Sequence, residues 1–74
     1  MNIKSVRLDP RRFRDEIRTL AQNMSGGEKV VLVIDLKDYN IVNEVVRVCR
    51  DSGLSVIDGS NNDREILLVV MRRV

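Results

Sequence analysis

"EKVVLVID", residues 28–35, contains five consecutive apolar side chains, four of which are β-branched. A short apolar run of this composition is typical of a central β-strand that is covered on both faces, or nearly so. We therefore predict a strand here. The segments before and after it decide the kind of sheet to which it belongs.

A helical pattern precedes this strand. Its apolar side chains recur at the spacing i, i+4, i+7, i+8 and i+11, and they are Phe13, Ile17, Leu20, Ala21 and Met24. The pattern predicts a helix from about residue 10 to about residue 24, with Asp9 as its N-cap and Pro10 at its first position. The glycines of "SGG", residues 25–27, are expected to supply a positive-φ stop. Further upstream, the alternation in "NIKSVRL", residues 2–8, predicts a short first strand.

A second helix and two strands are predicted after residue 35. "LKDYN", residues 36–40, has the composition of a turn, and an apolar helical face then follows, formed by Ile41, Val45, Val48 and Cys49 and widened by Val42 and Val46. Asp38 or Asn40 can cap this helix, and Gly53 ends it. "LSVID" (54–58), the turn "GSNND" (59–63) and "REILLVVMRR" (64–73) predict a β-hairpin.

The predicted element order is therefore β-α-β-α-β-β. It favours one domain over residues 1–74, an α/β (α+β) two-layer sandwich with two helices on one face of a four-stranded mixed sheet. Two helices cover only one face, yet residues 30–34 and 66–71 are apolar on both faces. Two explanations stay open at this point: a self-association surface, or shielding by the aliphatic stems of Lys and Arg.

The composition excludes several classes of function. The chain has no His and one Cys, so a transition-metal site or a His-based acid or base within one chain is not expected, and we predict no cofactor. Aromatic residues make up 3 % of the chain, which argues against a stacking platform for bases. No apolar run approaches the roughly 20 residues that span a bilayer, and a lone cysteine suits a reducing compartment, so we expect a cytoplasmic protein without a membrane partner.

Basic residues are concentrated near both ends of the chain, although the net charge is only +2. The two ends can meet on one surface if distant strands pair. The candidate contact residues for an anion or a partner are Arg7, Arg11, Arg12, Arg14, Arg18, Arg72 and Arg73. Around the predicted helix start, arginines and free backbone N–H groups favour an anion. The competing interpretation is a capped, exposed helix with i,i+4 pairs Arg11–Asp15 and Arg12–Glu16.

Several strings together resemble the TusA/SirA-like family of small sulfur-carrier proteins. They are "LD" at 8–9, "NMSGGEKVVLVID" at 23–35, "VCRDSGLSVID" at 48–58 and "ILLVVMRR" at 66–73. Members of that family that carry sulfur have a Cys-Pro-x-Pro motif at the start of the first helix, where the helix N-terminus stabilises the thiolate. In this sequence Pro10 stands at the position of that cysteine, and Arg11 and Phe13 stand at those of the two prolines. The resemblance thus implies the fold of the family without its nucleophile.

Three functions remain as hypotheses. The leading one is a non-catalytic TusA/SirA-like protein that binds another protein or forms a homodimer. The second is nucleic-acid binding through the arginines, because Alba chromatin proteins and the C-terminal domain of translation initiation factor 3 share this element order. The third is a residual sulfur-transfer or redox role for the lone thiol, Cys49, although its place on an apolar helix face favours a buried, unreactive side chain.

Overall fold

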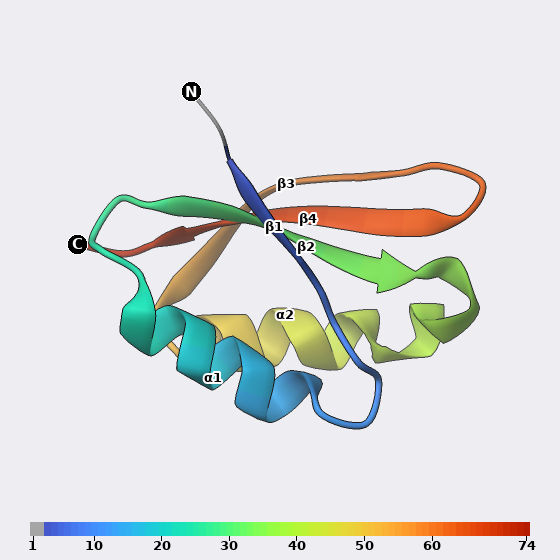
Figure 1. Ribbon diagram of the computed structural model, residues 1–74, viewed down its shortest axis with the longest axis horizontal. Coiled ribbons are helices and arrows are strands. Elements are labelled where there is room, and N and C mark those ends of the chain that lie inside the picture. The colour runs from blue at the N-terminus through green and yellow to red at the C-terminus, as the bar shows by residue number, and fades with distance from the viewer. Residues whose placement is uncertain (1–2) are drawn as a thin grey trace.

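The computed structural model describes residues 3–74, which form a sheet with two helices beneath it (Figure 1). The elements are β1 (Lys4–Arg7), α1 (Phe13–Asn23), β2 (Lys29–Asp35), the 3₁₀ helix η1 (Leu36–Ile41), α2 (Val42–Asp51), β3 (Leu54–Asn61) and β4 (Glu65–Arg72). This order confirms the predicted β-α-β-α-β-β fold. Asn2, the first residue of the predicted first strand, lies outside the described residues.

The strand order in the sheet is β1-β2-β4-β3. β1 runs parallel to β2, while β4 is antiparallel to both β2 and β3, so the sheet is mixed as predicted. β2 and β4 form the centre, because their apolar runs are the longest of the chain. The chain starts at one edge strand and the hairpin forms the other, so the terminal strands β1 and β4 do not pair.

The core lies between the helices and one face of the sheet. On β2, residues Val30, Leu32 and Ile34 are fully buried, and on the helices Ile17 and Val45 are also fully buried. These positions alternate along the strand and follow one stripe of each helix, as the two periodicities require. Cys49 lies within this core on α2.

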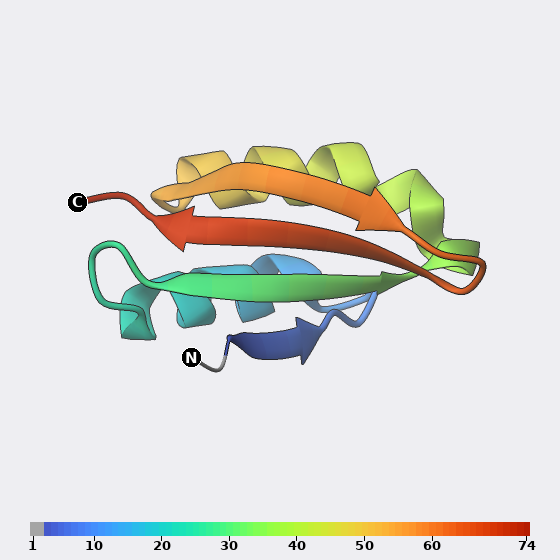
Figure 2. The same cartoon turned by 90° about the horizontal axis from the view of Figure 1, so that it is seen from above.

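The opposite face of the sheet carries a second apolar surface. Its centre consists of Val31 and Val33 on β2 and of Leu67, Val69 and Met71 on β4, all partly exposed. We call this set the open face; Figure 2 views it from above, with both helices behind the sheet. Within residues 3–74 the helices cover only one face of β2, and Val31 and Val33 on its other face are partly buried, so the prediction of a strand covered on both faces, or nearly so, is met fully on the helix side alone.

The first helix begins later than predicted, at Phe13. Its N-cap residue is Arg12, which makes no side-chain cap, so the prediction that Asp9 caps this helix with Pro10 at its first position is wrong. Asp9 instead opens a turn: its carbonyl accepts from the Arg12 N–H at 3.0 Å and its Oδ1 from the Arg11 N–H at 2.8 Å. Asp followed by Pro is favoured at the first two positions of a β-turn, and this turn delays the helix.

Two other predicted helix ends also differ. Residue Met24, at the C-cap of α1, is extended, and the positive φ of +83° belongs to Gly27 in the following turn. "LKDYN" forms most of η1, which runs directly into α2, so neither Asp38 nor Asn40 caps α2; its N-cap residue is Ile41. Asp35 caps η1 by accepting from the Lys37 N–H at 3.1 Å. The sequence patterns did not predict this cap, which precedes η1 and not α2.

The hairpin is confirmed, but its first strand is longer than predicted. β3 extends to Asn61 and has an irregular register between Val56 and Asp58, so Ile57 is an extra residue that is 46 % exposed. The turn is organised by Asn62, whose side-chain oxygen accepts from the N–H groups of Arg64 and Glu65, both at 2.8 Å. Three of the five residues of the predicted turn, 59–61, thus belong to the strand.

Gly53 ends α2 as predicted, with φ +87°. A Cβ at this position would also lie 2.5 Å from a guanidinium nitrogen of Arg72. We predict that Gly53→Ala lowers the free energy of unfolding by about 1–3 kcal/mol, because alanine is strained at positive φ and displaces Arg72. Gly26→Ala is the matched control, since its Cβ would meet only Val74 at 3.7 Å, an ordinary contact. Equal stability of the two variants in urea unfolding would contradict this role of Gly53.

Candidate functional site

The junction between β1 and α1 forms an open concavity of about 510 Å³ at the carboxyl ends of the parallel strands β1 and β2. Crevices at this end of parallel strands are common ligand sites. The charged side chains that line it are three cations, Arg7, Arg11 and Lys37, and three carboxylates, Asp9, Asp35 and Asp38, so their formal charges cancel. The concavity therefore has little net attraction for an anion.

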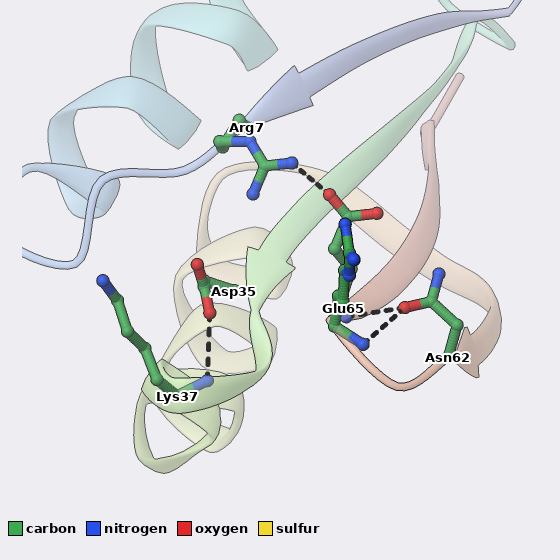
Figure 3. Close-up of polar contacts among 6 residues, drawn as sticks. Arg7, Asp35, Lys37, Asn62 and Glu65 are labelled. Atoms are coloured by element: carbon green, nitrogen blue, oxygen red, sulfur yellow. Dashed lines mark hydrogen bonds and ion pairs between the residues drawn. The ribbon is translucent and has the colours of Figure 1, made fainter.

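Several of these groups already have partners. Arg7 forms an ion pair with Glu65 of β4, reaching across the end of β2 (Figure 3). Asp9 and Asp35 each accept from a backbone N–H two residues further on, at 2.8 and 3.1 Å. The backbone N–H of Asp9 donates to Glu16 at 2.9 Å. These contacts hold the two loops in place.

Neither a thiol nor a hydroxyl lines this concavity. Pro10 stands where the resemblance places the sulfur-carrying cysteine, and a proline side chain offers neither a nucleophile nor a hydrogen-bond donor. Of the residues that the sequence places here, the structure therefore brings together Arg7, Asp9, Pro10 and Arg11, and it adds Asp35, Lys37 and Asp38 from the loop after β2. Its side chains are charged groups suited to binding, and it offers neither the thiol of the sulfur-carrier motif nor a hydroxyl.

The seven candidate arginines do not form one surface. The N–H of Arg72 bonds to Glu28, at the start of β2, whereas Arg7 lies opposite Val33 near its end. Five strand residues separate these levels, which corresponds to about 16 Å. The basic ends of the chain thus lie at opposite ends of the sheet.

Most of these arginines also have partners within the chain. Arg14 contacts Glu44 of α2 at 3.4 Å and lies 4.8 Å from the centre of the Phe13 ring, and Arg18 contacts Asp15 at 3.6 Å. The predicted pairs of Arg11 with Asp15 and of Arg12 with Glu16 do not form. Arg11 and Arg12 have no side-chain partner among residues 3–74, and both are exposed.

Arg72 and Arg73 satisfy backbone carbonyls around the C-terminus of α2. Arg72 donates to the Ser52 carbonyl at 2.9 Å, and Arg73 donates to the Arg50 carbonyl at 2.8 Å. The last carbonyls of a helix have no intrahelical partner, and they carry the negative end of its dipole. These two arginines therefore have a structural role that explains the basic end of β4.

The open face is the other candidate site. Val31 lies opposite Val69, and Val33 opposite Leu67, so the centre of this face is apolar across two neighbouring strands. The outer strands contribute polar side chains at the same levels: Ser5 beside Val31 on β1, and Asp58 and Ser60 beside Val69 and Leu67 on β3. An apolar centre with a polar rim is the usual arrangement of a protein-contact surface.

Charged residues bound the open face along β2, and the sequence analysis did not single them out. Lys29 at the start of β2 and Asp35 at its end share the side of Val31 and Val33, because strand positions two apart face the same way. Lys29 is exposed and makes no ion pair with a described residue. The sequence does contain the signal for this arrangement, because residues 29, 31, 33 and 35 are spaced two apart and therefore face the same side of a strand.

Cys49 is buried, and burial raises the pKa of its thiol from 9.0 to about 11. The interpretation of this residue as a core side chain is confirmed. Its placement between the helices and the sheet separates it from the concavity at the start of α1.

Residues 3–74 contain no helix long and apolar enough to cross a membrane. Within the same residues, no three His, Cys, Asp or Glu side chains are grouped so as to hold a metal ion.

No protein-family model matches the chain, and no curated protein matches it in sequence. Among solved structures, the solution structure of HP1264 from Helicobacter pylori has a similar fold, with a TM-score of 0.68 and 14 % sequence identity. The match covers 97 % of this chain and 100 % of that chain. At this identity the likeness extends to the fold alone.

We predict that Cys49 reacts slowly with a thiol reagent such as Ellman's reagent. A pKa of about 11 instead of 9.0 leaves about a hundredfold less thiolate at pH 8, and burial also blocks access. Labelling should therefore follow unfolding and accelerate in denaturant. Reaction of the folded protein at the rate of free cysteine would contradict the buried placement and would revive a sulfur or redox role.

Proposed function

We propose that this chain is a non-catalytic, cytoplasmic protein of the TusA/SirA-like type that works by binding a protein surface through its open face. The observation that carries the proposal is the apolar centre of that face, which consists of five side chains on two neighbouring strands and has no covering layer in residues 3–74. A sheet with helices on one side commonly carries polar residues on the other. In this chain β2 and β4 carry apolar side chains on both faces.

The energetics favour a covered face. Complete burial of one Val, Leu or Met side chain is worth about 1.5–3 kcal/mol, and the side chains of the open face are already partly buried by their neighbours in the sheet. Each therefore gains a part of that value when a partner excludes water. Five adjacent side chains together are enough to support specific association.

Two features support the non-catalytic part of the proposal. The concavity at the start of α1 has Pro10 in place of the sulfur-carrying cysteine and no other thiol or hydroxyl in its lining, and the lone thiol is buried in the core with a raised pKa. Nucleic-acid binding has weaker support, because five of the seven arginines have partners within the chain and the two basic ends lie far apart. Of these seven arginines, Arg11 and Arg12 have no side-chain partner among residues 3–74, but each lines a different hollow together with carboxylates.

A photo-crosslinking experiment tests this proposal. A benzophenone amino acid at Ser5, an exposed residue on the rim of the open face, should give protein adducts in source cells. The same group at Gln22, an exposed residue on α1, should give few. Adding Val69→Lys should remove the Ser5 adducts, because a charge then lies at the centre of the contact.

Two results would contradict the proposal. Adducts of equal yield from Ser5 and Gln22, or no protein adducts from Ser5, would argue against a contact surface on the open face. Adducts to nucleic acid from a benzophenone at Arg12 would favour the nucleic-acid hypothesis instead.

A further inference from the structure

We infer that the partner on the open face is a second copy of this chain, packed face to face about a two-fold axis that runs perpendicular to the strands. This inference rests on the proposed function and names its partner. It follows from the distribution of charge along β2 and β4, whose register pairs Lys29 with Met71 and Asp35 with Glu65.

The open side of β2 begins with Lys29, continues with two valines and ends with Asp35. Its ends are six residues apart, which corresponds to about 20 Å. Among the described residues neither Lys29 nor Asp35 forms an ion pair. The Asp35 carboxylate accepts from the backbone N–H of Lys37 and also borders the concavity that Arg7, Arg11 and Lys37 line. The strand is therefore positive at one end, apolar in the middle and negative at the other end.

A two-fold axis perpendicular to the strands reverses the direction of β2 in the second copy. It places Lys29 of each chain over Asp35 of the other, and it places Val31 over Val33 between them. An isologous contact makes every pairing twice, so two such ion pairs frame the apolar centre. The chain is complementary to itself in this arrangement.

The alternative face-to-face arrangement is disfavoured by the same charges. An axis parallel to the strands would place β2 over β4 with their levels unchanged. Asp35 lies at the level of Glu65, so carboxylates would meet in both halves of that interface, where the Arg7 ion pair compensates only one of each two, and Lys29 would meet Met71 instead of a carboxylate. With the perpendicular axis, Glu65 meets the Met71 end of β4 and keeps its ion pair with Arg7.

The size of the face is compatible with a dimer. The long dimension of the molecule, 32 Å, lies along the strands (Figure 1). β4 has eight residues and is about 26 Å long, and four strands with their side chains are roughly 20 Å wide, so each copy offers roughly 500 Å², or about 1,000 Å² in total. That total is at the lower end of stable interfaces, so the dimer should dissociate on dilution.

Sedimentation equilibrium of the full chain tests the inference. The mass should approach twice 8.5 kDa as concentration rises. Lys29→Glu and Asp35→Lys should each raise the dimer Kd by about tenfold or more, because each places like charges in both contacts. An equimolar mixture of the two variants should dimerise again, since opposite charges then meet in both contacts of the mixed dimer.

Three further samples separate charge pairing from misfolding. Asp35→Asn keeps an oxygen for the Lys37 N–H and should weaken the dimer less than Asp35→Lys does. Arg12→Glu makes the charge change of Lys29→Glu on the helix side, at an exposed residue without a side-chain partner, and should leave the dimer intact. Val69→Lys should abolish the dimer, with circular dichroism confirming that the monomer is folded.

Two results would overturn the inference. The first is a folded wild-type chain that stays monomeric up to millimolar concentration; Ser5 adducts to another protein would then leave the proposed function standing with a different partner. The second is a dimer that the two charge variants do not weaken, or that their mixture does not restore, because the perpendicular two-fold axis would then be wrong.

Discussion

The structure depends on one constraint: two helices can cover only one face of a four-stranded sheet. β2 and β4 are apolar at successive positions, so both of their faces carry apolar side chains. The helices bury Val30, Leu32 and Ile34 completely and leave Val31 and Val33 partly exposed. The hydrophobic effect that builds the core thus also creates a second apolar surface, and the fold has no further element in residues 3–74 to cover it.

The element order could be predicted because each strand and helix carries its own periodicity. The helix boundaries could not, because turns compete with helices for the same residues. Asp9 and Pro10 suit both the N-terminus of a helix and the first half of a β-turn, and only the approach of the chain from β1 selects the turn. Gly53 was predictable because a glycine directly after an apolar helical stripe has few other uses.

The candidate site was predicted only in part, because the order and register of the strands cannot be read from the positions of residues in the sequence. The arginines were grouped by their position in the sequence, but the sheet places β2 between β1 and β4, so Arg7 and Arg72 lie at opposite ends. The basic end of β4 resembled a contact surface, yet Arg72 and Arg73 bind carbonyls around the end of α2. These contacts could not be predicted from the sequence, because they form only when the hairpin packs beside the end of α2.

The same register gives the open face its direction. In a strand, residues two apart share a side, so the spacing of Lys29 and Asp35 puts opposite charges at the two ends of one apolar row. Among the described residues neither Lys29 nor Asp35 forms an ion pair, although Asp35 accepts from the Lys37 N–H and borders the concavity. The concavity at the start of α1 differs, because Arg7 is already paired with Glu65 and its two loops are fixed by local hydrogen bonds. Charges that are satisfied within the chain stabilise the fold, whereas charges left unpaired beside an apolar row are available to a partner. By this criterion the open face favours association with a partner more strongly than the concavity at the start of α1 does.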